Sequence, residues 1–278
     1  MFFLTEIMIK KLLGLSPSHL YNVAVCCIVK NENHYLPEWI EHHLKIGVSR
    51  FYIYDNESKI PVADTLSAYI EEGIIQLEFI EGKEMQMPAY EHCLANYGPE
   101  CQWIAFIDSD EFIVPKTVTG SLPDFLTDYK KFGGMGLNWL VFGSNGHLER
   151  PAGPQTKSYI KRTLKTNIIN DHIKTIVQPK YVKRVLDPHH FLFIKGKYCV
   201  NEDFERLTGP RVKHTSNKIQ LNHYYLRSFE DWQEKLERGR ADKGAALEVE
   251  RFYELDNEAN LITDETIIEL DMLIKETL

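Results

Sequence analysis

Asp108, Asp110 and Glu111 place three carboxylates within four positions, directly after an apolar run that starts at Trp103. The run is typical of a buried strand. Because an unpaired carboxylate is costly to bury, we expect these acids at the exit of that strand. In an extended chain Asp108 and Asp110 point the same way, so together they can hold one hard divalent cation. Such an ion keeps open positions for the oxygens of a diphosphate. The alternative is an acidic turn without an ion.

The composition describes a globular chain with an acidic balance. Its 278 residues suffice for a large core, and 44% of them are hydrophobic. The formal net charge of -8 disfavours broad nucleic-acid binding, so we expect no nucleic-acid partner. The five cysteines contain no C-x-x-C pair and favour a reducing compartment. We therefore expect a cytoplasmic protein.

Apolar strands and amphipathic helices alternate four times before Pro115. The first strand, Val23 to Val29, is apolar throughout, as in a strand covered on both faces. Polar clusters follow Val29, Tyr54 and Ile107, and parallel strands bring such clusters to one edge of a sheet. The pattern predicts an α/β, Rossmann-like fold with a mainly parallel central sheet. Short strand-like runs from 158 to 226 predict antiparallel additions, and helices follow them.

Changes in character along the chain suggest a division into three parts. The first part, an N-terminal segment, could rest on a membrane surface through residues 1–15, or it could pack against its own domain or a partner. The parts are residues 1–21 (an N-terminal amphipathic segment), 22–246 (one domain, with a nucleotide-binding half at 22–115 and an acceptor-binding, metal-completing half at 116–246) and 247–278 (a helical tail).

Other nucleotide-using classes lack their motifs here. A dinucleotide dehydrogenase needs glycines after its first strand, but the turn at 30–33 reads Lys-Asn-Glu-Asn. The chain also has no G-x-x-x-x-G-K-[ST] phosphate-binding loop. An aspartyl-phosphate phosphatase remains an alternative, because it too places D-x-D after an apolar strand. That class carries the motif on its first strand, followed by Thr or Val where this chain has Phe112.

Several ordered motifs resemble glycosyltransferase family 2, in the branch close to family 92. The resemblance covers about residues 22 to 243. The motifs are Cys27-Ile28-Val29-Lys30-Asn31-Glu32, Leu36-x-Glu38-Trp39-x-x-His42-His43, Tyr54-Asp55-Asn56-x-Ser58, Ile107-Asp108-Ser109-Asp110-Glu111-Phe112, Asn138-Trp139-x-x-Phe142-Gly143-Ser144, Lys174-x-Ile176-Val177-x-Pro179, His189-His190-Phe191 and His223-Tyr224-Tyr225-x-Arg227-Ser228. The resemblance implies a GT-A fold, a nucleotide-sugar donor such as UDP-hexose, and Mn²⁺ or Mg²⁺ held through the Asp-x-Asp motif.

The resemblance also assigns roles to residues. Asp108 and Asp110 bind the metal, Asp110 more directly, and His223 completes the metal shell from the later half. Trp139 and Ser144 are expected to contact the acceptor. Residues expected to bind the donor are Val29, Lys30, Asn31, Glu32, Asp55, Asn56, Asp108, Ser109, Lys174 and Arg227.

Inversion at the transferred sugar is also implied, and inversion needs a base across the sugar from the metal. The candidate bases, in order of preference, are Glu149 and His190, then Glu202 and Asp203. The expected acceptor is a glycan or glycolipid, such as lipopolysaccharide built on the cytoplasmic side. A non-catalytic module that binds a nucleotide sugar or glycan is the alternative function.

Overall fold

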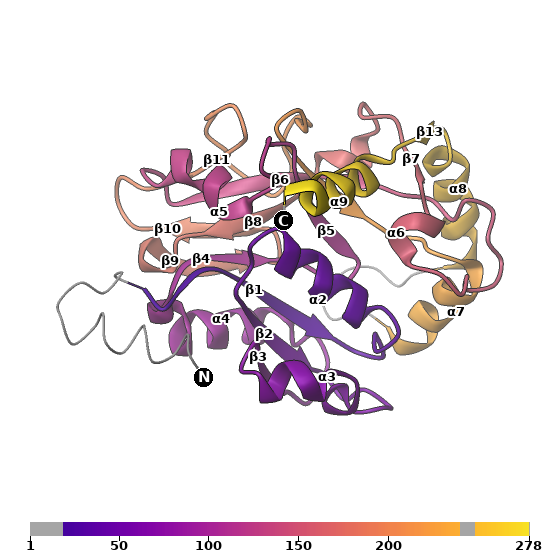
Figure 1. The fold of residues 1–278 in the computed structure, drawn as a ribbon, viewed down its shortest axis with the longest axis horizontal. Coiled ribbons are helices and arrows are strands. Elements are labelled where there is room, and N and C mark those ends of the chain that lie inside the picture. The colour runs from indigo at the N-terminus through magenta and orange to yellow at the C-terminus, as the bar shows by residue number, and fades with distance from the viewer. Residues whose placement is uncertain (1–18, 240–247, 278) are drawn as a thin grey trace.

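A nine-stranded sheet forms the centre of the molecule (Figure 1). The computed structural model describes residues 19–239 and 248–277. Most of the predicted N-terminal amphipathic segment therefore lies outside the described residues. The strand order is β3-β2-β1-β4-β8-β6-β12-β5, and β11 pairs with β6. The strands are β1 (Tyr21–Val29), β2 (Arg50–Asp55), β3 (Ile75–Phe79), β4 (Cys101–Phe106), β5 (Glu111–Pro115), β6 (Gly134–Val141), β8 (Ile173–Val177), β11 (Cys199–Val200) and β12 (Ile219–His223).

Most strands of this sheet run in one direction. β1 pairs in parallel with β2 and with β4, and β2 pairs in parallel with β3. β8 runs antiparallel to both β4 and β6, and β5 runs antiparallel to β12. The arrangement confirms the predicted α/β fold of the GT-A kind, with a mainly parallel sheet and antiparallel additions.

Helices cover both faces of the sheet because the first strand is apolar on both faces. Alternate residues of a strand point to opposite faces. Val25 belongs to the core cluster that contains Trp39 of α2 (Leu36–Lys45), whereas Cys26 belongs to the cluster that contains Tyr90 of α4 (Gln86–Asn96). The helices are α2 (Leu36–Lys45), α3 (Val62–Glu71), α4 (Gln86–Asn96), α5 (Leu122–Phe125), α6 (Gln155–Ser158), α7 (Phe229–Arg238), α8 (Val249–Ala259) and α9 (Thr266–Thr277).

Three strands from residues 158–226, namely β8, β11 and β12, join the central sheet, whereas the sequence predicted antiparallel additions there. β8 lies between β4 and β6, and β12 lies between β6 and β5. Separate two-stranded pairs are formed by β9 (Val182–Asp187) with β10 (His190–Phe193) and by β7 (Lys161–Arg162) with β13 (Ile262–Thr263). The sequence of β8 includes Lys174 and Thr175, so its full burial could not be read from apolar residues alone. Its insertion places Lys174 beside the Asp-x-Asp turn.

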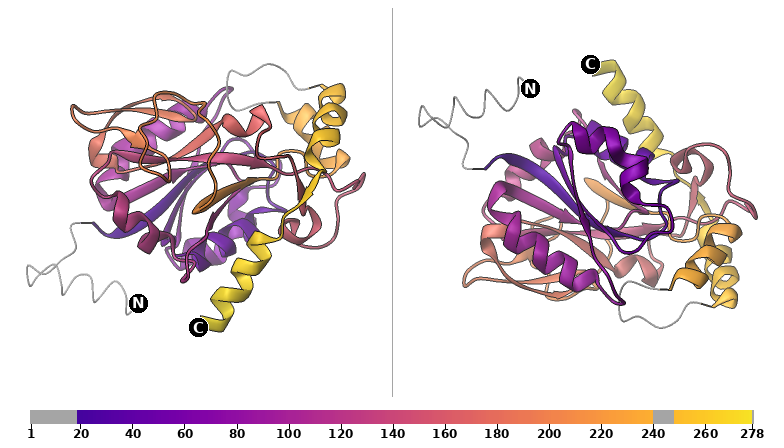
Figure 2. Two further views of the ribbon diagram at one scale, coloured as in Figure 1. Left: turned by 90° about the horizontal axis from the view of Figure 1, so that it is seen from above. Right: turned by 90° about the horizontal axis from the view of Figure 1, so that it is seen from below.

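The C-terminal helices pack around one end of the sheet. A capping box begins α7, where Ser228 and Asp231 bond each other's backbone N–H groups. Trp232 of α7 packs with Phe252 of α8, and both views of Figure 2 show α9 extending outwards at the C-terminal end. Within the described ranges, each helix is too short or too polar to cross a membrane.

Candidate active site

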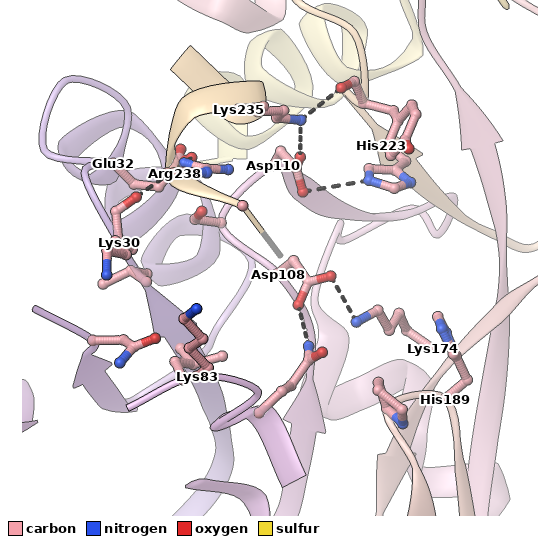
Figure 3. Close-up of a pocket in the computed structure, with 18 of the residues that line it drawn as sticks. Lys30, Glu32, Lys83, Asp108, Asp110, Lys174, His189, His223, Lys235 and Arg238 are labelled. Atoms are coloured by element: carbon pink, nitrogen blue, oxygen red, sulfur yellow. Dashed lines mark hydrogen bonds and ion pairs between the residues drawn. The ribbon is translucent and has the colours of Figure 1, made fainter. Parts of the chain in front are cut away.

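A cavity opens where β1 and β4 end, and both halves of the chain line it (Figure 3). Polar side chains gather there because the carboxyl ends of parallel strands meet at the same edge of a sheet. The predicted site residues that line this cavity are Val29, Lys30, Glu32, Asn56, Asp108, Ser109, Asp110, Trp139, Lys174 and His223.

Asp108 is held by a neutral and a charged donor. Its Oδ1 accepts from Gln86 Nε2 at 2.9 Å, and its Oδ2 accepts from Lys174 Nζ at 2.8 Å. Lys174 is 1% exposed. Burial alone would lower the pKa of this ammonium, but Asp108 and Glu111 raise it well above its ordinary value. Lys174 therefore brings a fixed positive charge to the cavity wall.

Asp110 uses its two oxygens for different partners. Its Oδ2 accepts from Lys235 Nζ of α7 at 2.8 Å, and its Oδ1 lies 3.4 Å from His223 Nε2. Burial would raise the pKa of Asp110, but Lys235 and His223 hold it well below its usual range. Burial lowers the pKa of His223, which favours a neutral imidazole. The Oδ1 atom and the imidazole nitrogen thus face one small volume.

Two buried polar atoms beside this pair have no hydrogen-bond partner among the described residues: His223 Nδ1 and Glu111 Oε1. They lie 4.0 Å apart. The other oxygen of Glu111, Oε2, accepts from the backbone N–H of Asp108 at 2.8 Å. Burial raises the pKa of Glu111 well above its usual range. Glu111 therefore fixes the Asp108 turn with one oxygen and faces the imidazole of His223 with the other.

Glu32, which follows β1, is the carboxylate of a second group of buried ion pairs. Its carboxylate accepts from Arg227 at 2.7 Å and also from Arg238. Burial would raise the pKa of Glu32, but the two guanidinium groups lower it to about 2. The Arg227 guanidinium lies 3.6 Å from the ring centre of Tyr35, and the Arg227 backbone adopts a φ of 55°. That left-handed conformation is rare for a residue with a side chain, so several contacts must hold it.

Four residues expected to contact a substrate do not line the cavity, and each has a partner within the protein. Asp55 accepts from the backbone N–H groups of Ser58 and Val62, at 3.0 and 3.1 Å. Asn31 Oδ1 accepts from the Lys59 backbone, and Ser144 bonds Asp256 of α8. Arg227 reaches the site indirectly, through Glu32 and the Ser109 carbonyl.

None of the four candidate bases lies in the lining of the cavity. Glu149 is exposed, and His190 lines a different cavity behind β10. Glu202 is buried, and its two oxygens accept from three backbone N–H groups at the start of β12, the closest at 2.7 Å. Asp203 forms an exposed ion pair with Lys218. The region expected to supply the base therefore contributes to the cavity lining, but the four candidate side chains do not face the cavity.

Several residues that line the cavity were not among the predicted site residues. Lys235 and Arg238 are the basic residues in the last turn of α7. A basic group there could either pair with a diphosphate or form a solvated helix face. Gln86 is the first residue of α4, and His189 directly precedes the candidate base His190. The local sequence around each does not indicate that it lines a cavity. Only the folded chain shows which of two adjacent histidines faces the cavity.

No metal centre made of protein ligands alone is visible in the described ranges: no cluster of three or more His, Cys, Asp and Glu side chains is placed to hold an ion. The pair of Asp110 Oδ1 and His223 Nε2 can supply two ligands. Two atoms bound to one small ion at about 2.1 Å lie roughly 3 Å apart in octahedral geometry. Their separation of 3.4 Å is near that value. Substrate oxygens would have to complete the shell.

Comparison with known proteins identifies relatives across almost the whole chain. The family model for glycosyltransferase family 92 matches residues 19–278. A family 92 protein of Ricinus communis is 26% identical over 244 residues, which cover 84% of this chain and 43% of that protein. One of Oryza sativa subsp. japonica is 29% identical over 188 residues, which cover 65% and 31%. The chain thus spans less than half the length of these curated relatives.

Two solved structures show weaker similarity. Staphylococcus aureus TarS is 14% identical, with a TM-score of 0.38, over 58% of this chain and 48% of that chain. The galactosyltransferase LgtC, solved with donor and acceptor sugar analogues, is 15% identical, with a TM-score of 0.32, over 87% and 98%.

Proposed function

Because this chain belongs to glycosyltransferase family 92, we propose that it transfers a sugar from a nucleoside diphosphate donor to a hydroxyl group. A UDP-hexose is the first donor to test. The observation that carries the proposal is the cavity itself. Asp108 and Asp110 enter it from the turn after β4, and Lys174, His223 and Lys235 enter it from the later half. Such a set of alternating charges suits a metal–diphosphate group.

The proposed cofactor is Mn²⁺ or Mg²⁺, held by Asp110 Oδ1 and His223 Nε2, with Asp108 beside them. The orphaned Nδ1 of His223 and Oε1 of Glu111 support this assignment. A histidine that binds a metal commonly donates its other N–H to a carboxylate, which fixes the ring. When bound, the ion neutralises the charge that develops on the leaving diphosphate. Magnesium sites often combine one or two carboxylates with substrate phosphates, so two protein ligands suffice.

The cations of the later half have a separate task in this proposal. Lys174 and Lys235 hold Asp108 and Asp110 in place and also contribute positive charge to the cavity. Arg238 donates to the carbonyl of Lys30 at 2.9 Å, so α7 closes over the loop after β1. Fixed charges of this kind stabilise a developing anion without reorganising during the reaction. We assign the nucleotide to the Lys30 side and the sugar to the Trp139 side.

We also propose the acceptor, the location and the stereochemical course of the transfer. The acceptor is a glycan or glycolipid, as in lipopolysaccharide assembly on the cytoplasmic side of a membrane. The transfer inverts the configuration at the anomeric carbon. Proton nuclear magnetic resonance of the product tests this claim, because retention of the donor's anomeric configuration would contradict inversion.

A thermal-shift panel tests the function. The full chain is heated with UDP-, GDP- and dTDP-sugars, each with and without Mn²⁺, alongside Mn²⁺ alone. A bound donor raises the melting temperature by mass action, so at least one donor should do so only with the metal. Release of free nucleoside diphosphate is then measured for that donor. Stabilisation without release indicates a non-catalytic binding module, and no stabilisation by any donor contradicts the proposal.

A further inference from the structure

A second histidine lines the same cavity, away from the Asp110–His223 pair. His189 belongs to the turn between β9 and β10. Figure 3 shows it on the Lys174 side of the cavity, whereas His223 lies on the Asp110 side. The indole of Trp139 packs against both imidazoles, with ring centres 5.4 Å from His189 and 4.4 Å from His223. The two histidines thus border the presumed sugar position from different sides.

Three hydrogen bonds to other described residues hold His189 in this position. Its backbone N–H donates to Asp187 Oδ1 at 2.8 Å, and its carbonyl accepts from Thr175 Oγ1 at 2.5 Å. Its ring Nδ1 lies 2.8 Å from the carbonyl oxygen of Ile173. A carbonyl oxygen can only accept, so Nδ1 carries the proton of the neutral ring. The proton-accepting lone pair is therefore on Nε2.

The strand that orients His189 also orients the Asp-x-Asp turn. Ile173 and Thr175 bond His189, and the residue between them, Lys174, bonds Asp108. The three residues are consecutive in β8, at the centre of the sheet. The position of the imidazole relative to Asp108 is thus set by rigid structure, which a catalytic group requires.

We propose that His189 is the catalytic base of the sugar transfer. The inference rests on the proposed function and extends it to the acceptor side. His189 Nε2 takes the proton of the acceptor hydroxyl while that oxygen bonds to the anomeric carbon. The bond from this carbon to the diphosphate oxygen breaks, and its electron pair leaves with the diphosphate. The adjacent His190 begins β10 and lines the separate cavity behind that strand, so it serves as a matched control.

The test compares His189→Ala and His189→Gln with His190→Ala. The probe is a UDP-sugar that the wild-type chain hydrolyses with Mn²⁺, water replacing the acceptor hydroxyl, and free UDP is measured. Loss of a general base should lower the rate about 10²-fold or more in both His189 variants. The hydrolysis rate of His190→Ala should stay within about threefold of the wild-type rate, because this variant removes no general base from the cavity. Added imidazole should restore part of the rate to His189→Ala, and UDP binding with Mn²⁺ should be unchanged.

The outcomes separate the two proposals. A wild-type chain that releases no UDP from any UDP-sugar contradicts the proposed function, and the base with it. Wild-type turnover with equally active His189 variants overturns only the base. Loss of UDP binding in both His189 variants, with no rescue by imidazole, also overturns it, because His189 would then position the donor.

Discussion

The two halves of the domain contribute opposite charges to the site. Among the described residues, every carboxylate in the cavity lining comes from the earlier half: Glu32, Asp108 and Asp110. The buried cations come from the later half, where Lys174, Arg227 and Lys235 are each less than a tenth exposed. The lysines of the earlier half that line the cavity, Lys30 and Lys83, are only partly buried or exposed. Neither half can bury its own charges alone, so the site forms only when the halves pack together.

This comparison leads first to a prediction about stability. Arg227→Met leaves Glu32 with one cation fewer in a buried position. Breaking a buried ion pair by removing one partner costs about 3–5 kcal/mol, so the free energy of unfolding in urea should fall by that amount. Arg251→Met is the control, because its pair with Glu254 is exposed and worth less than about 1 kcal/mol. Equal losses in the two variants would contradict the dependence of Glu32 on the later half.

The second prediction concerns pH. The pKa of Glu32 is about 2 in the folded chain, against an ordinary value of 4.5. A folded-state pKa below the unfolded one adds stability above pH 4.5 that is lost as the pH falls towards 2. The shift corresponds to about 3 kcal/mol. Between pH 5 and pH 2, the free energy of unfolding in urea should fall less steeply for Glu32→Gln than for the wild type. Glu254→Gln, an exposed control, should follow the wild type, and identical slopes in all three chains would refute the shift.

A smaller effect is expected at Glu111. In Glu111→Gln the side-chain oxygen must still accept from the Asp108 N–H, so the amide NH₂ faces His223 Nδ1. That nitrogen must then accept, which moves the ring proton to Nε2 and removes a metal ligand. Changes to such supporting groups typically cost 10–100-fold in metal affinity, and we expect a loss in that range for Mn²⁺ in the presence of UDP. Glu91→Gln, on the exposed side of α4, should bind as the wild type does, and unchanged affinity in Glu111→Gln would remove Glu111 from this role.

The earlier half was predictable from the sequence because its strands are continuous apolar runs that end in polar clusters. Val23 to Val29 and the strand before Asp108 both lie where expected, in parallel. The expected cavity residues after them also lie together. Asp55 was expected to bind the donor, and its carboxylate accepts from the backbone of Ser58 and Val62. A capping carboxylate and a ligand-binding one look alike in sequence.

The later half was less predictable because long-range contacts define it. Glu32 and Arg227 are 195 positions apart, and Lys174 and Asp108 are 66 apart. β8 contains a lysine and a threonine, so its sequence does not indicate a buried central strand. The orientation of His189 depends on hydrogen bonds to Ile173 and Thr175 of β8, which no local sequence pattern contains.

The central claim is that the two halves together hold a metal–diphosphate group. Calorimetric titration of UDP into the full chain, with and without Mn²⁺, tests it most directly, using the wild type, Asp110→Asn and the exposed control Asp64→Asn. We predict that Mn²⁺ tightens UDP binding at least about tenfold in the wild type and in Asp64→Asn, and has little effect in Asp110→Asn, since metal affinity depends on its ligands and their partners. Equal UDP affinity with and without Mn²⁺ in the wild type would contradict the claim.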